Sequence, residues 1–284
     1  MIWLSSPVWA SDIQVITSNR PLALLTQSIL GDQGHAQSLL KPGQSPHDFA
    51  LSFTDRQQLE ESQFVVWIGA DIEPYLQRIL HSLKAGQLRL DQLFELDEHD
   101  GNHHDHGHDH HHGHSDTEGD FHLWLSPRHA MTISKAIASE LAQQFPQQAR
   151  QFAQNQQRLA QEITLADRQT RELLSSAGRA PYGIVHNAYS HFIEHYQLPS
   201  PQLISQSTEQ PPGVRRLLEL RQQLPAQSCL LVEPEHANGW PQQLAQRENY
   251  RLVQVDTLAT RKDYSHYKDW LTALGQDFRN CLTP

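Results

Sequence analysis

The stretch QQARQFAQNQQRLAQEITLADRQTRELLSSA, residues 147–177, carries a long helical pattern. Its apolar residues recur at three, four and seven positions, which places one apolar face on an α-helix: Phe152, Leu159, Ile163, Ala166 and Leu173. About 30 residues at a rise of about 1.5 Å per residue give a rod of about 45 Å, longer than a small domain is wide. We therefore expect a rigid helix over residues 146–178 that joins two separate lobes.

Short apolar runs alternate with helical patterns on both sides of this helix. They lie at residues 13–18, 35–40 and 64–70 before it, and at 182–187, 201–205, 228–234 and 251–256 after it. Unbroken apolar runs of this length are typical of parallel strands that helices cover on both faces. The sequence predicts an α/β fold with two lobes, residues 11–145 and 179–284, each a parallel sheet flanked by helices.

Local signals place two further helices. Ser126 is a plausible N-cap with Pro127 in the first turn of a helix that Pro146 ends. A helix is also expected to start near Pro21, after the first strand.

Charge is concentrated in one segment. The formal net charge is -10, and eight of the 32 acidic residues lie in residues 97–120, so the remainder of the chain is nearly neutral. We find no basic stripe for nucleic acid and no polybasic patch for an anionic membrane.

The N-terminus MIWLSSPVWA, residues 1–10, is apolar, and Val8 and Ala10 fit the small-residue pattern of a signal-peptidase site before Ser11. It lacks a positive n-region, so we interpret it as the remnant of a secretory signal; a buried N-terminal strand is the alternative. No later apolar run approaches the ~18 residues that span a membrane. We expect an exported, soluble protein, in which the two cysteines, Cys229 and Cys281, either form a disulfide or remain as buried thiols.

The segment DEHDGNHHDHGHDHHHGHSD, residues 97–116, holds nine of the 19 histidines and no lysine or arginine. Its low hydrophobicity and like charge cannot offset the entropy of ordering, so a disordered loop is expected over residues 97–120. Tethered imidazoles reach an effective concentration of order mM near a binding site and would collect metal ions there. A solvated loop with incidental metal affinity is the alternative.

Four residues follow predicted strands or the histidine-rich loop in positions suited to a metal site. Ligands of parallel α/β sheets bind beyond the carboxyl ends of strands. His47 follows the second strand, His122 follows the loop, and His186 and Asp256 end later strands. Three imidazoles and one carboxylate would form a closed shell suited to zinc, although ligands so far apart in sequence are a weak signal.

Other histidines are given different roles. His191 and His195 are four residues apart on the helix after His186, without the glutamate of zinc proteases, and we interpret them as surface residues. His129, His236 and His266 are expected to be solvated or to orient ligands. Asp48 and Asn187 either orient the ligands that precede them or cap helices.

Five motifs resemble the zinc-binding component of bacterial high-affinity zinc ABC importers (ZnuA type), in the metal-binding cluster of solute-binding proteins. They are GQSPHDFALSFTDRQQL (43–59), FHLWLSPRHA (121–130), VHNAYSHFIEHYQL (185–198), LVEPEHANG (231–239) and VDTLAT (255–260). The resemblance covers the mature chain in order. It implies two α/β lobes joined by a long helix, a metal between them, and an acidic histidine-rich insertion before the second ligand.

The resemblance also assigns residues. It implies that His47, His122 and His186 are the imidazole ligands, and manganese members carry a glutamate in place of His186, which favours zinc. Asp256 matches a fourth, carboxylate ligand, a position that water or another carboxylate fills in some members. The chain has Pro46 where one variant has a ligating glutamate. Cys229 and Cys281 match the disulfide of some zinc members.

The expected function is a monomeric periplasmic receptor that captures Zn²⁺, its transported ligand, and delivers it to the membrane permease of an ABC importer without a catalytic step. A zinc hydrolase is one alternative, with Glu209 as the candidate base. A metal-storage or chaperone protein acting through the loop is another, but it leaves the two lobes unexplained.

Deleting residues 97–116 should remove a weak phase of zinc binding and leave one tight site of nearly unchanged affinity, as measured by calorimetry. In the intact protein, acidification from about pH 7.5 to 5.5 should strip the loop first, because protons compete for imidazoles with a pKa of about 6.5. Loss of the tight site in the deletion variant would contradict this and place a ligand in the loop.

Overall fold

The computed structural model describes residues 12–45, 49–70, 72–94, 120–205, 210–261 and 264–283. The first lobe is built on a parallel sheet with strand order β2-β1-β3-β4. Its strands are β1 (Ile13–Thr17), β2 (Gly34–Ser38), β3 (Phe64–Trp67) and β4 (Gly86–Arg89). Its helices are α1 (Arg20–Leu30), η1 (Gly31–Gln33), α2 (Phe53–Glu61), α3 (Pro74–Leu80), α4 (Leu90–Leu93), η2 (Leu123–Leu125) and α5 (Pro127–Gln144).

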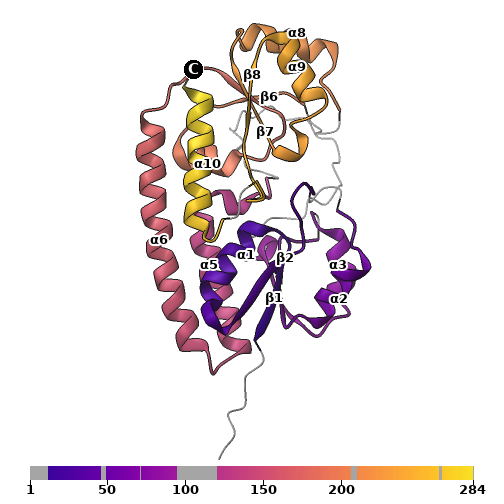
Figure 1. The fold of residues 1–284 in the computed structure, drawn as a ribbon, viewed down its shortest axis with the longest axis vertical. Coiled ribbons are helices and arrows are strands. Elements are labelled where there is room, and N and C mark those ends of the chain that lie inside the picture. Colours follow the sequence, from indigo (N-terminus) through magenta and orange to yellow (C-terminus); the bar gives the residue numbers. More distant parts are fainter. Residues whose placement is uncertain are drawn as a thin grey trace, which may run out of the picture.

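The second lobe repeats this arrangement with strand order β6-β5-β7-β8, again all parallel. Its strands are β5 (Tyr182–Ile184), β6 (Gln202–Leu203), β7 (Cys229–Val232) and β8 (Arg251–Gln254). Its helices are α7 (Ser190–Tyr196), α8 (Val214–Gln223), η3 (Pro234–His236), α9 (Trp240–Glu248) and α10 (Tyr267–Leu282). The predicted fold class, two α/β lobes with parallel sheets joined by a long helix, is confirmed (Figure 1).

Helix starts follow from side chains that satisfy the first free backbone amides. Ser126 Oγ accepts a hydrogen bond from the amide of His129, and Pro127 is the first residue of α5, as predicted. Asn19 Oδ1 accepts from the amide of Leu22 and caps α1 at 3.1 Å, which confirms a helix start beside Pro21. Strand β4 was not anticipated, because its residues are only partly buried and form no apolar run.

The long helix α6 (Ala149–Ser175) connects the two lobes (Figure 1). Its buried face is continuous from end to end: Phe152, Asn155, Leu159, Ile163, Ala166, Thr170 and Leu174. The sequence pattern identified Phe152, Leu159, Ile163 and Ala166. It missed the buried polar residues Asn155 and Thr170, and Leu174 rather than Leu173 is buried at the end of the face. This face packs against α5 of the first lobe and α10 at the end of the chain.

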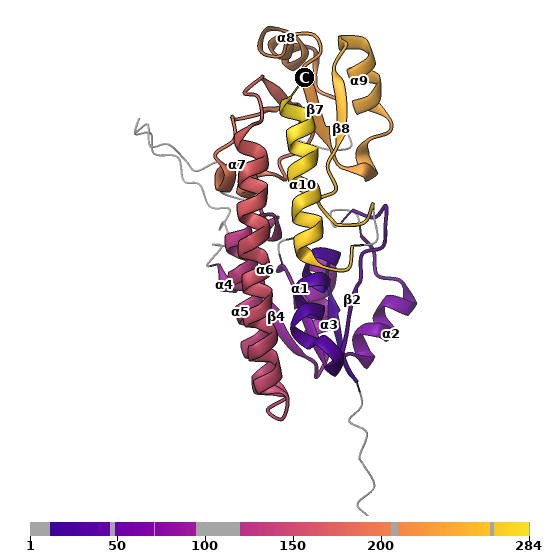
Figure 2. The same cartoon turned by 60° about the vertical axis from the view of Figure 1, so that its left-hand side comes forward.

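Helix α10 forms a second connection that the sequence did not predict. It runs beside α6 in the same direction and also contacts α1 of the first lobe (Figures 1 and 2). The two helices approach closely at Gly275, where an added Cβ would lie 2.6 Å from Thr170 Cγ2. Two packed helices therefore hold the lobes at a fixed separation.

The C-terminal end of α10 is bonded to the second sheet. Cys281, near the end of α10, forms a disulfide with Cys229, the first residue of β7, as predicted. Both cysteines are buried. The two cysteines are separated by 52 residues in the sequence. The bond therefore anchors the end of α10 to the second lobe, and α10 in turn helps to fix the position of that lobe.

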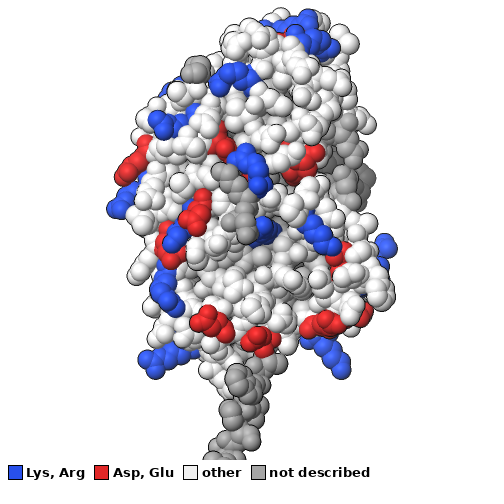
Figure 3. All heavy atoms as spheres, viewed as in Figure 1, with Lys and Arg blue, Asp and Glu red and all other residues white. Residues whose placement is uncertain are grey.

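Charged side chains of both signs are scattered over the face shown in Figure 3, with uncharged surface between them. Among the described residues, no helix combines the length and the apolar character needed to cross a lipid bilayer.

Replacing both cysteines with serine should lower the free energy of unfolding by about 4 kcal/mol, because the unfolded chain loses the constraint on a loop of this length. Urea denaturation of the unreduced protein measures the loss, and the wild type in excess reductant is the matched control. Free thiols in the unreduced, unfolded wild type, or equal stability of all three samples, would contradict the pairing.

Candidate metal centre

The carboxyl ends of three adjacent strands in the second lobe place acids and a histidine together. Strands β5, β7 and β8 are parallel neighbours, so the residues that follow them share one edge of the sheet. His186 follows β5, Glu233 follows β7 and Asp256 follows β8. This edge faces the first lobe (Figure 1).

His186 is held by a buried carboxylate. Its Nδ1 lies 3.1 Å from Glu233 Oε1. Burial alone would lower the pKa of His186, but the hydrogen bond and the negative charge of Glu233 outweigh it and raise the pKa. Burial would likewise raise the pKa of Glu233, but its pairing with His186 lowers the pKa. The pair is thus an ionised carboxylate that fixes the orientation of an imidazole.

His122 is held in the same way from the first lobe. Asp120 Oδ1 accepts hydrogen bonds from the backbone amide of His122 at 2.9 Å and from its Nδ1 at 2.7 Å. Burial acts to raise the pKa of Asp120, but the bonds and charge of His122, with the charge of His191, lower it to about 2. Asp120 is therefore charged at any physiological pH.

Asp120 also bonds to the second lobe. Its Oδ2 accepts a hydrogen bond from the amide of Ser190, the first residue of α7, at 2.9 Å. Its carbonyl oxygen lies 2.6 Å from Nε2 of His191, one residue further along. A single residue therefore orients a candidate ligand and connects the two lobes.

The turn after His122 is fixed by further contacts between distant segments. Trp124 Nε1 in η2 donates to the carbonyl of Thr257 at 2.8 Å, and the Tyr267 hydroxyl donates to the carbonyl of Trp124 at 2.7 Å. Both bonds are buried. The backbone that carries His122 is thus held by the loop after β8 and by α10.

The two predicted imidazole ligands lie next to each other. The ring centroids of His122 and His186 are 5.3 Å apart. With a Zn–N bond of about 2.1 Å, two imidazoles on a tetrahedral zinc ion have ring centres about 5 Å apart. Beside them is a cavity of about 10 Å³, space for roughly one water-sized sphere. Its described lining is Ser45, His122, His186, Glu233, Glu235, His236, Thr257 and Leu258.

The other two predicted ligands are placed differently. His47 lies outside the described residues, as do Asp48 and the histidine-rich loop. Asp256 is buried, and its carboxylate accepts hydrogen bonds from Thr260 through Oδ1 and from the amide of Arg261 through Oδ2, at 2.7 Å for the latter. Within the described parts of the chain, no three histidine, cysteine or acidic side chains form a complete metal-binding group.

Two glutamates at this edge were not considered as site residues from the sequence. Glu233 orients His186, and Glu235 lines the cavity. Burial, together with the charges of Glu233 and Asp256, raises the pKa of Glu235 to about 7. The signal that identified His186 and Asp256, a polar residue just beyond an apolar strand, applies equally to the LVEPE sequence at 231–235.

The interpretation of His191 as a surface residue is wrong. His191 is buried, and its ring also lies 4.8 Å, centroid to centroid, from that of His129. Burial and the neighbouring charge of His191 lower the pKa of His129 to about 4. His195 is partly buried and lies 2.8 Å from Asp167 Oδ1 on α6. His191 thus supports the structure around Asp120, and His195 supports the structure around α6.

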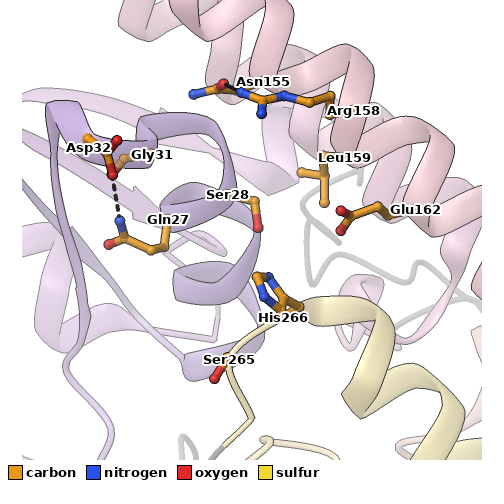
Figure 4. Close-up of a pocket in the computed structure, with 10 residues that line it drawn as sticks. All are labelled: Gln27, Ser28, Gly31, Asp32, Asn155, Arg158, Leu159, Glu162, Ser265 and His266. Atoms are coloured by element: carbon orange, nitrogen blue, oxygen red, sulfur yellow. Dashed lines mark hydrogen bonds between the residues drawn. The ribbon is translucent and has the colours of Figure 1, made fainter.

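A separate pocket of about 380 Å³ lies between α1, α6 and the segment before α10 (Figure 4). Gln27 donates a hydrogen bond to the Gly31 carbonyl at its edge, and His266 is the single imidazole among its described lining residues. Arg158 and Glu162 bring charges of opposite sign. This pocket therefore lacks the paired histidines of the cavity between the lobes.

Glu209, the candidate base for a hydrolase, lies outside the described residues. Residues 1–10, interpreted as a signal remnant, lie outside them as well.

Comparison with solved structures supports the fold. A crystal structure of ZnuA aligns with a TM-score of 0.74 at 18% identity, covering 95% of this chain and 99% of that one. Zn(II)-bound AdcA from Streptococcus pneumoniae aligns with a TM-score of 0.72 at 17% identity, covering 96% of this chain and 58% of that longer one. The laminin binding protein Lmb of Streptococcus agalactiae, described as an adhesin with metal transporting activity, aligns with a TM-score of 0.75 at 17% identity, covering 95% of this chain and all of that one.

Sequence comparison extends the similarity to curated proteins. The high-affinity zinc uptake system protein ZnuA of Yersinia pestis is 29% identical, covering 98% of this chain and 94% of the relative. The ZnuA protein of Haemophilus ducreyi is 27% identical, covering 96% and 94% respectively. Residues 15–281 match the family described as zinc-uptake complex component A, periplasmic. The chain belongs to this ZnuA family.

Proposed function

We propose that this protein is a periplasmic receptor that captures Zn²⁺ between its lobes and delivers it to the permease of an ABC importer. The observation that carries the proposal is the pair His122 and His186, whose rings lie 5.3 Å apart beside an ion-sized cavity, each held by a buried carboxylate. Membership of the ZnuA family and the zinc-uptake relatives support zinc as the cargo and the periplasm as the location.

The chemistry of the two imidazoles favours a metal of zinc's class. A carboxylate oxygen can only accept, so the neutral ring donates from Nδ1 and carries its lone pair on Nε2. Carboxylates in this position fix the tautomer and increase the basicity of the ligating nitrogen. His47 is proposed as the third imidazole and a carboxylate as the fourth ligand, and the sequence predicts Asp256 for that position. Four such donors form a closed N₃O shell, which suits binding and not hydrolysis.

The proposed mechanism has no catalytic step. Zinc enters the space between the lobes, displaces water and binds to preformed imidazoles. The packing of α6 against both α5 and α10 favours small adjustments of loops over a wide opening of the lobes. Release then requires docking onto the permease, which the protein meets as a monomer.

Replacing His122 or His186 with alanine should weaken tight zinc binding by at least about tenfold, since loss of a ligand should cost no less than loss of the groups that orient ligands. Competition titration against a chelator measures the change. His266→Ala, at an exposed position in the separate pocket, is the control and should bind as the wild type does. Unchanged affinity in both ligand variants would refute the proposed site.

Asp120→Asn should weaken zinc binding by about 10- to 100-fold, because the neutral amide no longer holds the tautomer and charge of His122. Asp167→Asn offers a matched control, since Asp167 on α6 also pairs with a histidine, His195 on α7, away from the cavity. Both variants are measured by chelator competition, with circular dichroism as a check of folding. Equal affinities in the folded variants would show that Asp120 does not position the ligand.

A further inference from the structure

The side chain of His191 reaches from the second lobe to the first. It is the second residue of α7, and it is buried. Its Nε2 lies 2.6 Å from the carbonyl oxygen of Asp120, which belongs to the segment before α5. Its ring meets that of His129, in the first turn of α5, edge to face with centroids 4.8 Å apart. One side chain of α7 therefore contacts both the residue that orients His122 and the helix that follows it.

The contact with Asp120 fixes which nitrogen of His191 carries a proton. A carbonyl oxygen only accepts, so Nε2 of His191 donates. The bond is buried, and a buried carbonyl that loses its donor is costly, so the backbone at Asp120 would have to move towards another partner. The neighbouring His129, whose pKa burial lowers to about 4, is neutral at physiological pH and packs against His191 as an uncharged ring.

Asp120 transmits this contact to the candidate metal centre. Its carboxylate accepts two hydrogen bonds from His122 and one from the amide of Ser190, the residue before His191. The backbone and the side chain of Asp120 are thus both bonded to the first turn of α7. A shift of the Asp120 backbone would move its carboxylate and turn the ring of His122 with it.

The same turn of α7 is connected to the second candidate ligand. Ser190 Oγ donates to Oδ1 of Asn187 at 3.0 Å, and Asn187 directly follows His186. The turn therefore links the two segments that carry His122 and His186, whose rings lie 5.3 Å apart. A binding site has to hold its groups within about 0.5 Å of their productive positions, so the bonds that join these two segments bear on affinity.

We propose that His191 is a positioning residue of the zinc site: its Nε2–H holds the backbone of Asp120 against α7 and thereby fixes His122 at the distance from His186 that one ion requires. This inference rests on the proposed function. It gives His191 no contact with the ion. If His191 only filled space against His129, any ring of similar shape would serve equally well.

The test separates the N–H donor of His191 from its ring. His191→Phe keeps a ring that can pack on His129 and removes the donor, whereas His191→Gln places an amide N–H near the position of Nε2. His195→Phe, on the same helix and paired with Asp167 away from the cavity, is the control. Each variant is checked for folding by circular dichroism and titrated with zinc against a chelator. His191→Phe is also made in the Asp120→Asn background, because residues that act through one group are not additive.

His191→Phe should weaken zinc binding by about tenfold, whereas His191→Gln and His195→Phe should stay within about threefold of the wild type. In the Asp120→Asn background, His191→Phe should cost less than about threefold, because the carboxylate through which it acts is gone. Four results would overturn the inference: a folded His191→Phe variant within about threefold of the wild type, equal losses in the Phe and Gln variants, an equal loss in His195→Phe, or equal losses in both backgrounds.

A measurement on the wild type does not depend on the folding of any variant. Long-range ¹H–¹⁵N NMR of the imidazoles should find the proton of neutral His191 on Nε2, and a proton on Nδ1 instead would contradict the proposed bond. The His122 and His186 variants separate the two proposals. If they lose zinc while His191→Phe does not, only this inference fails; if they too keep the wild-type affinity, the proposed function fails.

Discussion

The apolar face of α6 has to be buried, and the helices that bury it come from opposite ends of the chain. Helix α5 leads out of the first lobe, and α10 ends the second. Turning one lobe against the other would expose leucine, isoleucine and phenylalanine side chains along this face, at about 25 cal/mol for each Å². The lobes are therefore held by packing, and the disulfide at the end of α10 strengthens the same arrangement.

A fixed distance between the lobes allows a binding site to be divided between them. His122 belongs to the segment before α5, and His186 to the end of β5, yet their rings lie in contact distance. Asp120 makes this division stable, because its carboxylate serves His122 on one side and the start of α7 on the other. The contact of Arg20 with the carbonyl of Tyr264 adds a further link between the two carboxyl edges. Under the proposed function, binding needs little reorganisation, so the entropic cost of binding is low.

The buried acids account for the character of the site. A buried carboxylate is costly unless it is paired, and Asp120 and Glu233 are each paired with an imidazole. The pairing lowers the pKa of both acids, so the negative charge remains when a proton leaves the histidine and a metal ion takes its place. The two imidazoles and their supporting carboxylates thus form one electrostatic unit, which supports the proposal that a cation binds between them.

Features set by neighbouring residues could be predicted from the sequence, and features set by distant contacts could not. The apolar runs, the cap at Ser126, the helix start near Pro21 and the face of α6 are local patterns, so fold class and helix starts followed from them. The motifs also pointed to His122 and His186.

Strand β4 was missed because a partly buried edge strand has no apolar run. The burial of His191 depends on Asp120, 71 residues away, and the position of Glu235 depends on two lobes meeting. Only the tertiary structure decided these, because burial and pairing are properties of the space between elements and not of the residues alone.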